Sequence, residues 1–530
     1  MNKFTLIFIT VYIFLVGCQK PLELTPYDFL SPTEYYENKT QINNALTGVY
    51  STLKDNALYA NNMLGRMGLD ADEAYNRNSN DANSIGDYAV STADIKVLSF
   101  WRVLYAGINR ANSLLANINK PKDLTDSERA TIEGETLFLR SYFYFLLVSN
   151  FGDVPLILQP INTADSKSHQ IERMSKVIVY EAIVADLEKA SDLVQPIDKV
   201  GYGGRVSQSA VWAMLARVNL HMAGKQINDH SRYEEVKKWA RKVMELPIHR
   251  LNPSFKDVFV KLATDKYDIG ESILEVEFYG NGTGIYAGLS GYVGVQNGIY
   301  NQTDIDKGFG YSYINTTNYT YDVYASGDLR RDWTIAPFYY AFPNNEKKAV
   351  EVQWATNQIM NRNCGKFRRD SETLLPKHKS FTPQNFPLIR LSDVMLMFAE
   401  ADNEINNGAT PEGYEAINKV RRRGFGLDYN IPNVTVDLKN LSKSVFLERM
   451  QEERTRELAF ECLRKGDLVR WGIFLTNMKQ RLSEANSHID FYDLRFAKNM
   501  FRNVSARDIV WPIPSYELGV NFKLIQNAGW

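Results

Sequence analysis

The stretch IEGETLFLRSYFYFLLV, residues 132–148, is the strongest indication of the fold. Its apolar and aromatic side chains recur at the spacing of a helix, and Gly152 and Pro155 then end the pattern. These side chains are Leu137, Phe138, Leu139, Tyr142, Phe143, Phe145 and Leu146. A second amphipathic stretch, residues 177–194, carries Ile183, Leu187, Ala190 and Leu193. The two stretches predict a pair of helices that pack against each other.

Similar stretches flank this pair on both sides, at residues 34–53, 99–118, 208–223, 233–244, 389–405 and 411–420. The last four predict two further helix pairs, and Pro411 stands where the first turn of a helix tolerates proline. Helix, turn and helix is the unit of a tetratricopeptide-like array, in which one pair alone cannot bury its apolar face. A generic helical bundle would show similar periodicity. Both readings predict a mainly α fold.

The overall composition is that of a large globular chain. The 530 residues and 60.7 kDa exceed the roughly 250–300 residues at which one core stops growing, so we expect two lobes or an extended repeat array. Hydrophobic residues at 44% and charged residues at 23% indicate neither disorder nor a fibrous repeat. The 61 Lys and Arg residues nearly cancel the 62 Asp and Glu residues, which provides no broad positive field for nucleic acid. We therefore expect no nucleic-acid partner.

The helical pattern breaks at residues 271–345. Residues 280–310 contain 9 glycines, and residues 281–340 contain 10 tyrosines, both several times the average density of the chain. Long irregular segments in compact proteins are usually functional or disordered, and this density of tyrosine argues against disorder. We predict a loop and short-strand insertion here.

The N-terminus has the pattern of a lipoprotein signal. An uncharged apolar run, residues 4–16, is too short to span a membrane as a helix but fits the central part of a signal peptide. The sequence Leu15-Val16-Gly17-Cys18 that ends it looks like a bacterial lipobox. We predict a signal peptide at 1–17, lipidation of Cys18, an extended tether at 18–33 and membrane attachment through the lipid. The alternative is an ordinary secretory signal with a chance cysteine.

No signature of catalysis, metal binding or a cofactor stands out. The remaining cysteines, Cys364 and Cys462, have no metal-type neighbours and are expected to be free thiols more often than a disulfide. The segment Gly201-Tyr202-Gly203-Gly204 lacks the third glycine of a dinucleotide-binding loop, and Asp70-Ala71-Asp72 reads as a polar surface turn. We expect no metal, no cofactor and no enzyme activity. A glycosidase remains an alternative, because two carboxylates that meet only in space leave no sequence pattern.

Charged and aromatic residues on the predicted helices are interpreted as structural. The series Glu453, Arg454, Glu457, Glu461, Arg464, Asp467 and Arg470 has the spacing of ion pairs. The segment Asp328-x-Arg330-Arg331 is read in the same way. The aromatic residues Trp101, Tyr105, Tyr142 and Tyr144 stand at core spacing. We predict that all of these residues hold the fold together.

Several motifs, in order along the chain, resemble the SusD/RagB family of outer-membrane lipoproteins. Those in the first half are the lipobox, Trp101-x-x-x-Tyr105-x-x-Ile108-x-x-Ala111-Asn112, Glu135-x-x-Phe138-Leu139-Arg140-x-Tyr142-x-Tyr144, Asn150-Phe151-Gly152-Asp153-Val154-Pro155 and Gly204-Arg205-Val206-Ser207. Those in the second half are Ile389-Arg390-Leu391-Ser392-Asp393, Glu453-Arg454-x-x-Glu457-Leu458-Ala459-Phe460-Glu461, Asp467-Leu468-x-Arg470-Trp471, Trp511-Pro512-Ile513-Pro514 and the terminal Gln526-Asn527-Ala528-Gly529-Trp530. Cys462 and Lys465 depart from the pattern, since the family often has glycine and an aromatic residue there, and Ala528 stands where proline is common.

The resemblance implies a fold and a function. The fold is an array of tetratricopeptide-like helix pairs at about 34–270 and 385–475, with a less regular ligand-binding lobe at 271–385 and a C-terminal segment at 476–530. The function is non-catalytic capture of oligosaccharides at the cell surface for import by a partner, a SusC-like TonB-dependent outer-membrane transporter. Some members bind peptides, which is the main alternative within the fold. A surface glycoside hydrolase and a purely structural clamp on the transporter are the alternatives from other classes.

Two polar, aromatic-rich stretches are the candidates for the ligand site, because loop aromatics on a rigid scaffold combine apolar contact with hydrogen bonding. The first stretch, residues 70–88, supplies Asp72, Tyr75, Asn76, Arg77, Asn80 and Tyr88. The second supplies Tyr286, Tyr292, Asn297, Tyr300, Tyr311 and Tyr313. Neither stretch matches a family motif. The choice of these residues therefore depends on their chemistry alone.

Overall fold

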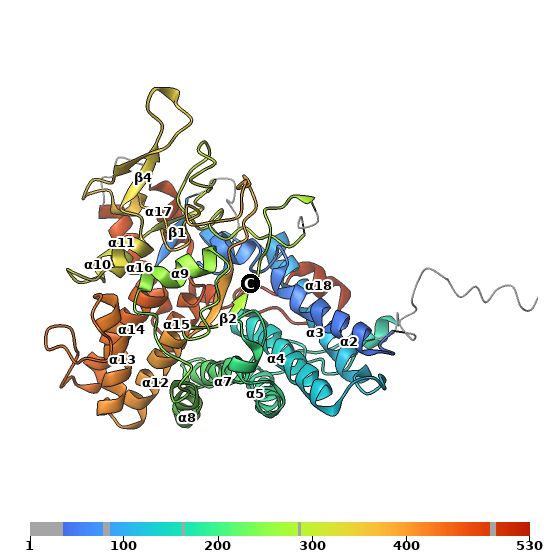
Figure 1. The fold of residues 1–530 in the computed structure, drawn as a ribbon. Helices are drawn as coiled ribbons and strands as arrows, with labels where there is room; N and C mark the ends of the chain where they lie inside the picture. Colours follow the sequence, from blue (N-terminus) through green and yellow to red (C-terminus); the bar gives the residue numbers. More distant parts are fainter. Residues whose placement is uncertain (1–34, 78–84, 162–164, 285–287, 488–493) are drawn as a thin grey trace, which may run out of the picture.

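The computed structural model describes residues 35–77, 85–161, 165–284, 288–487 and 494–530 (Figure 1). Cys18 and the predicted signal peptide and tether lie outside these residues. The long helices are α2 (Lys39–Tyr50), α3 (Ile95–Asn117), α4 (Asp126–Phe151), α5 (Lys176–Leu193), α7 (Gln208–Ala223), α8 (Arg232–Met244), α12 (Leu391–Ile405), α13 (Pro411–Gly424) and α14 (Lys443–Leu458). Each helix pair expected from periodicity is present, and their ends differ from the expected ones by a few residues.

The long helices pack in series. α3 packs on α4, α4 on α5, α5 on α7 and α7 on α8; after a long excursion the chain returns with α12, which packs against α8 and carries α13 and α14. These helices form the lower arc in Figure 1. The predicted mainly helical fold of stacked helix pairs is therefore confirmed.

The sequence of α4 explains both of its ends and its burial. Thr125 and Glu128 form a reciprocal capping box at the N-terminus, which satisfies two backbone donors. Gly152 ends the helix with φ of +72°, a conformation that disfavours a side chain. Between them the aromatic side chains Tyr142, Phe143 and Tyr144 are buried. α4 is thus the central helix of the first half of the array.

Loops, short helices and three two-stranded antiparallel sheets make up much of the rest of the described chain. The strands are β1 (Ala74–Asn76) with β3 (Ile314–Thr316), β2 (Ser272–Val276) with β6 (Phe386–Arg390), and β4 (Phe338–Ala341) with β5 (Val350–Gln353). β1 and β4 lie in the upper part of the molecule in Figure 1, and β2 lies at its centre. The shorter helices are α6 (Ile197–Val200), α9 (Phe255–Ala263), α10 (Asn318–Asp322), α11 (Arg330–Thr334), α15 (Arg464–Trp471), α16 (Phe474–Ser487), α17 (Arg495–Asn503) and α18 (Ser515–Val520). Single helical turns are η1 (Ser51–Lys54), η2 (Met63–Met67), η4 (Ile85–Asp87), η5 (Ser166–His169), η7 (Pro343–Asn345), η8 (Ile359–Asn361) and η9 (Ala506–Ile509). The predicted loop and short-strand region is therefore present.

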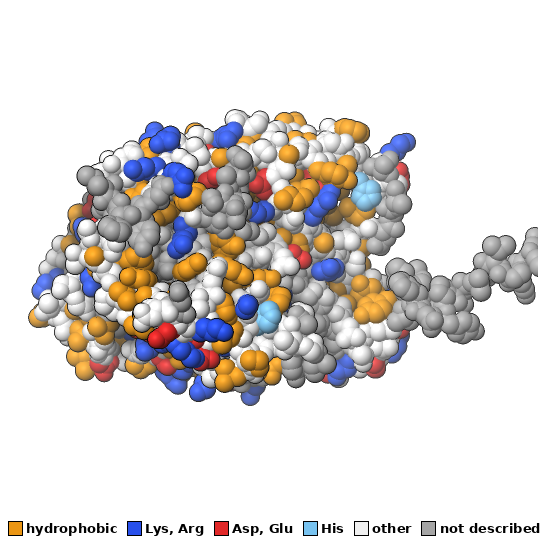
Figure 2. Space-filling view, turned by 90° about the horizontal axis from the view of Figure 1, so that it is seen from above, with side chains coloured by type: hydrophobic (Ala, Val, Ile, Leu, Met, Phe, Trp, Pro, Cys, Tyr) orange, Lys and Arg blue, Asp and Glu red, His pale blue; other side chains and the backbone are white. Residues whose placement is uncertain are grey.

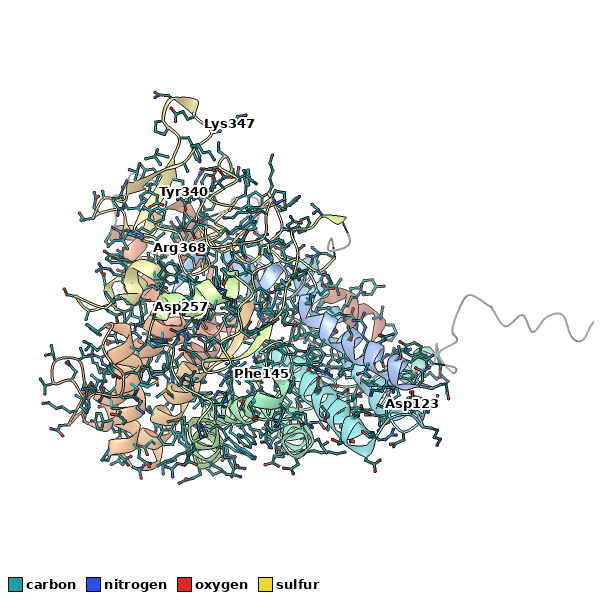
Figure 3. All side chains as sticks on the ribbon, viewed as in Figure 1. Asp123, Phe145, Asp257, Tyr340, Lys347 and Arg368 are labelled. Carbon is teal, nitrogen blue, oxygen red and sulfur yellow. The ribbon has the colours of Figure 1, made fainter. Side chains whose placement is uncertain are left out.

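The β4–β5 hairpin projects from this upper part. Lys347 marks its tip, and Tyr340 and Arg368 lie below it (Figure 3). Tyr340 packs with Phe338 and Ile299 in a small hydrophobic cluster of its own. This hairpin is therefore supported by contacts separate from the main core.

A buried charge network joins the upper part to the helix array. We use this name for Glu271, Arg330, Lys366, Arg390, Arg423, Glu453, Glu457 and Glu461. Glu457 on α14 accepts hydrogen bonds from Arg390 at 2.8 Å and Arg423 at 2.6 Å, and Arg330 on α11 reaches it at 3.1 Å. The prediction that the charged series from Glu453 to Arg470 is structural is confirmed, because its members form buried ion pairs. Most partners come from distant segments rather than from neighbouring turns.

The C-terminal segment returns to the first helices. Trp511 packs edge-on against Phe100 of α3 and Phe151 of α4, with ring centroids 5.0 and 5.6 Å apart. The Asn527 amide donates to the carbonyl oxygens of Phe151 and Trp511 at 2.9 and 2.8 Å. These contacts give a structural reason for the Trp511 and Asn527 motifs. Trp101, Tyr142 and Tyr144 are buried packing residues as predicted, and Tyr105 is half-buried.

No helix in the described part of the chain is long and apolar enough to cross a membrane.

Candidate functional site

A row of aromatic side chains, linked partly by ring contacts and partly by the backbone, lies on the loop-rich part of the molecule. We call it the aromatic surface and define it by Arg77, Tyr292, Tyr300, Tyr311, Tyr313 and Phe381. The Arg77 guanidinium lies 5.0 Å from the centroid of the Tyr300 ring, and the Tyr311 and Tyr313 rings are 6.1 Å apart. Tyr292 packs against Phe381 with ring centroids 5.3 Å apart. Figure 2 views the molecule from above Figure 1 and shows hydrophobic side chains, tyrosines included, in patches with Lys and Arg between them.

Backbone hydrogen bonds hold these rings in place. The amides of Tyr311 and Tyr313 donate to the carbonyls of Val295 and Gln296 at 2.7 and 2.8 Å. The Arg77 amide donates to the Tyr313 carbonyl at 2.9 Å, so the segment after β1 joins the row. The rings therefore stand on a paired backbone, which limits the conformational entropy that binding has to remove.

Buried amide side chains support the glycine-rich turns beneath the rings. The Asn297 side-chain oxygen accepts from the Gly294 amide at 2.8 Å, and the Asn301 amide donates to the carbonyls of Asp304 and Gly308 at 2.7 and 2.9 Å. Gly294 has φ of +77°, and a Cβ there would lie 2.7 Å from the Phe367 carbonyl oxygen. A glycine is therefore required at this position.

The exposure of the rings differs along the row. Tyr300 is 39% exposed, whereas Tyr292, Tyr311, Tyr313 and Phe381 are half-buried. Partial burial raises the pKa of Tyr292, with a smaller contribution from Tyr311. Its hydroxyl therefore stays protonated at neutral pH and can donate a hydrogen bond. Rings with polar tips beside a guanidinium can bind a ligand that has both apolar faces and hydroxyl groups.

Four residues predicted to bind ligand are instead buried. The Asp72 carboxylate is fully buried and pairs with Arg464 at 2.7 and 2.9 Å. Tyr75 and Tyr88 are each 2% exposed, and their hydroxyls donate to the carbonyls of Met360 and Asp70. Asn297 is also fully buried. Their prediction as ligand contacts is corrected, because composition alone does not show that these polar tips have partners inside the protein.

The other candidates have different positions. Asn76 lies in β1 opposite Ile314 and is 8% exposed, which leaves it little surface for a ligand. Arg77, Tyr292, Tyr300, Tyr311 and Tyr313 are brought together in the aromatic surface. Asn80 and Tyr286 lie outside the described residues. Phe381 was missed because it follows the tyrosine-rich window, and only its packing against Tyr292 places it in the row.

The segment Asp70-Ala71-Asp72 is also corrected, from a surface turn to a buried segment. All three residues are at most 2% exposed. Asp70 pairs with Lys465 at 2.5 Å, yet burial outweighs this pairing and raises the pKa of Asp70. The segment therefore connects the start of β1 to α15 through ion pairs.

The hydroxyl of Tyr75 provides a test of this structural reading. It donates to the Met360 carbonyl at 2.7 Å and accepts from the Asn315 amide at 3.2 Å. We expect Tyr75→Phe to lower the free energy of unfolding by about 1–2 kcal/mol, since buried polar groups lose their partner. Chemical denaturation measures this change. If Tyr75→Phe instead binds ligand more weakly and keeps its stability, Tyr75 contacts the ligand.

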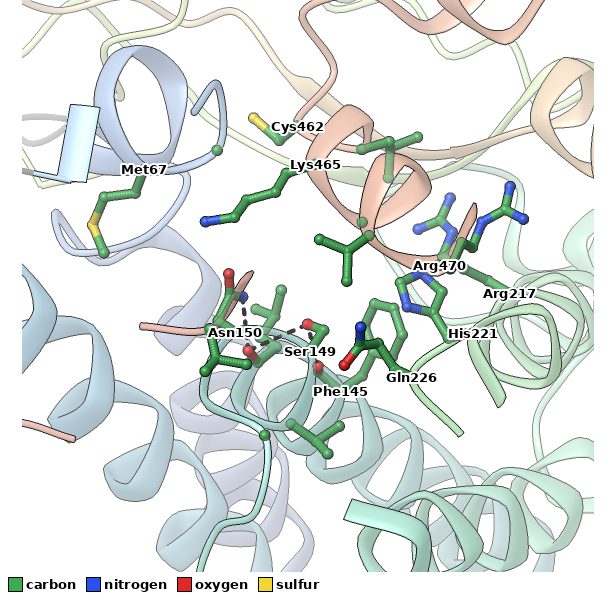
Figure 4. Close-up of a pocket in the computed structure, with 18 of the residues that line it drawn as sticks. Met67, Phe145, Ser149, Asn150, Arg217, His221, Gln226, Cys462, Lys465 and Arg470 are labelled. Carbon is green, nitrogen blue, oxygen red and sulfur yellow. Dashed lines mark hydrogen bonds between the residues drawn. The ribbon is translucent and has the colours of Figure 1, made fainter. Parts of the chain in front are cut away.

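A partly open cavity of about 110 Å³ lies between α4, α7 and α15 (Figure 4). Ser149 and Asn150 border it from α4, His221 from α7, and Cys462 and Lys465 from the opposite side. Ligand pockets usually occupy roughly 300–1,000 Å³, so this cavity is too small for an oligosaccharide. It is therefore not the ligand site.

The two family departures at this cavity have structural explanations. Cys462 has φ of +62°, the conformation that favours glycine. Lys465 places its ammonium 5.5 Å from the centroids of the Tyr88 and Trp511 rings, so a cation contacts aromatic rings from this position. Cys364 and Cys462 are free thiols, Cys364 buried and Cys462 half-buried. Among the described residues, no group of His, Cys, Asp or Glu side chains could hold a metal ion.

Comparisons with known proteins identify the family. Residues 277–530 match the model of the SusD family, and residues 21–220 match a SusD-like model described as starch-binding associating with outer membrane. The chain therefore belongs to the SusD/RagB family, whose members are non-catalytic binding proteins.

Individual relatives agree along almost the whole chain. A SusD-like protein of Formosa agariphila is 25% identical over 98% of both chains. A SusD homologue of Bacteroides thetaiotaomicron, also 25% identical, superposes with a TM-score of 0.83 over 94% of this chain and 98% of its own. A laminarin-binding SusD-like protein, 24% identical, has the same fold with a TM-score of 0.72 over 93% of this chain and 100% of its own.

Proposed function

We propose that this protein is a cell-surface lipoprotein that captures oligosaccharides and delivers them to a SusC-like TonB-dependent outer-membrane transporter, without catalysis. The aromatic surface is the observation that supports this function best. Sugars present C–H faces that pack on aromatic rings and hydroxyl rims that hydrogen bond to tyrosine and arginine. The family model described as starch-binding, and the laminarin-binding protein of the same fold, favour a glycan as the ligand.

Attachment to the membrane follows from the sequence of the N-terminus in this proposal. Cys18 carries the lipid, and residues 18–33 connect it to the fold. The association with the outer membrane in the family description agrees with such an anchor. Protease treatment of intact cells tests the orientation: loss of the protein shows that it faces the exterior, and full protection contradicts surface display.

A peptide ligand is the second candidate, since it is known within the family. A peptide site would favour charged side chains that pair with termini and ionic residues. Of the six residues that define the aromatic surface, one is a cation, Arg77, and it already packs on the Tyr300 ring. The aromatic row therefore favours a glycan over a peptide.

The function is tested with native gels that contain one polysaccharide each, from plant, host and microbial sources, laminarin and starch among them. Retardation by one polymer, with no new reducing ends in the sample, supports glycan capture and identifies the polymer. Retardation with new reducing ends would support a hydrolase. Passage through every gel unretarded would contradict the proposal and favour a peptide ligand or a structural role.

The aromatic surface makes a quantitative prediction about binding. We expect Tyr300→Ala and Tyr311→Ala each to weaken binding of the retarding polymer by about 1–3 kcal/mol, or roughly 5- to 150-fold in Kd, because each removes a ring from the platform. The melting temperature should change little. Isothermal titration calorimetry and differential scanning calorimetry measure the two quantities.

The matched control is Tyr516→Ala. Tyr516 is 55% exposed on α18 and packs on Arg102, so it has the same chemistry on another surface. Its loss should leave the affinity unchanged. Equal affinities for the wild type and both surface variants would place the ligand site elsewhere.

A further inference from the structure

A groove of about 570 Å³ lies between α2, the turn that follows α6 and the end of β2. Tyr50, Lys54, Tyr202, Gly204, Arg205 and Glu277 line it. Its volume is within the range of sites that bind small molecules. Tyr202 and Gly204 of the Gly201-Tyr202-Gly203-Gly204 segment line the groove, and this segment has no role in the aromatic surface.

The glycines of this segment let two carboxylate side chains approach the backbone. A Cβ on Gly204 would lie 1.9 Å from the Glu277 carboxyl carbon, so the Glu277 side chain lies directly across this residue. A Cβ on Gly203 would lie 3.2 Å from the Glu275 side chain, and the Glu275 amide donates to the Gly203 carbonyl at 2.8 Å. The glycines of this segment therefore leave room for the Glu277 side chain, which explains them without a nucleotide-binding role.

Two tyrosine rings stand beside this carboxylate. Tyr202 and Tyr267 have ring centroids 5.5 Å apart, and Tyr267 is 41% exposed. The Tyr267 hydroxyl donates to Glu277, which fixes both side chains. Tyr202 is half-buried, and a carboxylate beside partly exposed rings can accept hydrogen bonds from a ligand whose apolar face packs on those rings.

Cationic donors are also present in the groove. Arg205 donates through Nε to Glu135 at 2.9 Å, and the buried Glu135 also accepts from the Tyr50 hydroxyl at 2.6 Å. The Arg205 side chain is 37% exposed, and its two terminal nitrogens have no hydrogen-bond partner among the described residues. A guanidinium anchored at one nitrogen presents its other donors in a fixed orientation.

We propose that this groove is a second carbohydrate-binding site, which takes a sugar unit with its hydroxyls between Glu277 and Arg205 and its C–H face on Tyr202, against which Tyr267 packs. This inference rests on the proposed glycan-binding function and adds a site to it. Gly288 and Leu289 line the groove, and Tyr292 of the aromatic surface follows in the same segment. One polysaccharide chain that contacts both sites binds more tightly than a short oligosaccharide, because the second contact is intramolecular.

The test uses the mature chain in detergent and calorimetric titration with laminarin, starch, xylan and inulin, followed by a trisaccharide of whichever polymer binds. We expect the wild-type chain to bind about two trisaccharides and the Tyr202→Ala/Tyr267→Ala chain about one. The Kd of this double variant for the polymer should be at least about fivefold higher than that of the wild type. The Tyr300→Ala/Tyr311→Ala chain should also retain about one. Tyr516→Ala should behave as the wild type.

The outcomes separate the two proposals. Binding of none of the four polymers by the wild type overturns the proposed function, and the second site with it. A stoichiometry of one in the wild type, or wild-type behaviour of the Tyr202→Ala/Tyr267→Ala chain, overturns the second site alone. If that chain melts early, Glu277→Gln replaces it, since this change keeps the side-chain shape and removes the charged acceptor; an unchanged polymer Kd would then reject the site.

Discussion

The variant Glu457→Gln is expected to lower the free energy of unfolding by about 3–5 kcal/mol. Glu457 is fully buried and forms ion pairs with three guanidiniums, those of Arg330, Arg390 and Arg423. Glutamine keeps the shape but not the charge, so buried cations lose their compensation. A buried ion pair contributes little against an apolar replacement, whereas the removal of one partner is strongly destabilising.

The same network predicts how this loss depends on pH. The three guanidiniums hold the pKa of Glu457 well below its usual range despite burial, and arginines hold the pKa of Glu453 at about 2. A lowered carboxyl pKa stabilises the fold above the unfolded-state pKa of about 4.3, and this contribution disappears as the pH falls through the folded-state value. The wild type should therefore exceed Glu457→Gln in stability at pH 7, and the difference should shrink in acid.

Urea denaturation at pH 7 and at pH 3 measures these differences. Glu448→Gln is the matched control, because Glu448 lies on the same helix but its side chain is 64% exposed beside Arg449. An exposed ion pair contributes roughly 0–1 kcal/mol, so this variant should stay close to the wild type. A loss below 1 kcal/mol for Glu457→Gln would show that the network does not hold the two parts of the molecule together.

The network also shows what the sequence could and could not predict. The spacing of Glu453 and Glu457, continued by Glu461 just beyond the helix end, predicted α14 to be a charged structural helix. The partners Arg330, Arg390 and Arg423 are separated from it along the chain, and helical spacing only relates residues within a few turns. The ion pairs between these distant segments could therefore be identified only from the structure.

The candidate site, too, was predictable from the sequence only in part. The tyrosine density of residues 281–340 correctly indicated where rings gather, because Tyr292, Tyr300, Tyr311 and Tyr313 lie in one row. Tyr75 and Tyr88 have the same chemistry but donate to carbonyls inside the protein. A tyrosine hydroxyl can be satisfied by buried backbone as well as by a ligand, so residue type alone does not distinguish the two roles.

Glu73→Gln is expected to stabilise the protein in alkaline solution by up to about 4 kcal/mol. Glu73 is 1% exposed, and neither carboxylate oxygen accepts a hydrogen bond from a side chain among the described residues. Burial raises its pKa to about 8, although Arg464 opposes the shift. At about 1.4 kcal/mol per pKa unit, ionisation of this buried group destabilises the fold by an amount of this order.

The sign follows from proton linkage. The folded state binds the Glu73 proton more tightly than the unfolded state does, so wild-type stability falls as the pH rises from about 4.5 to about 8 and then levels off. Glutamine does not titrate. The variant should therefore match the wild type or be slightly less stable at pH 4.5, and exceed it increasingly up to about pH 8.

Asp72→Asn provides a matched control with the opposite sign. Asp72 is the adjacent, equally buried carboxylate, but its pairing with Arg464 lowers its pKa. Its charge stabilises the fold above pH 4, so Asp72→Asn should be less stable than the wild type at pH 8, where Glu73→Gln is more stable. Denaturation curves of the wild type, Glu73→Gln and Asp72→Asn at pH 4.5, 6.5 and 8.5 measure these differences in the free energy of unfolding. A constant difference between Glu73→Gln and the wild type across this range would mean that Glu73 is ionised throughout, held by charges such as Arg464 more strongly than burial disfavours it.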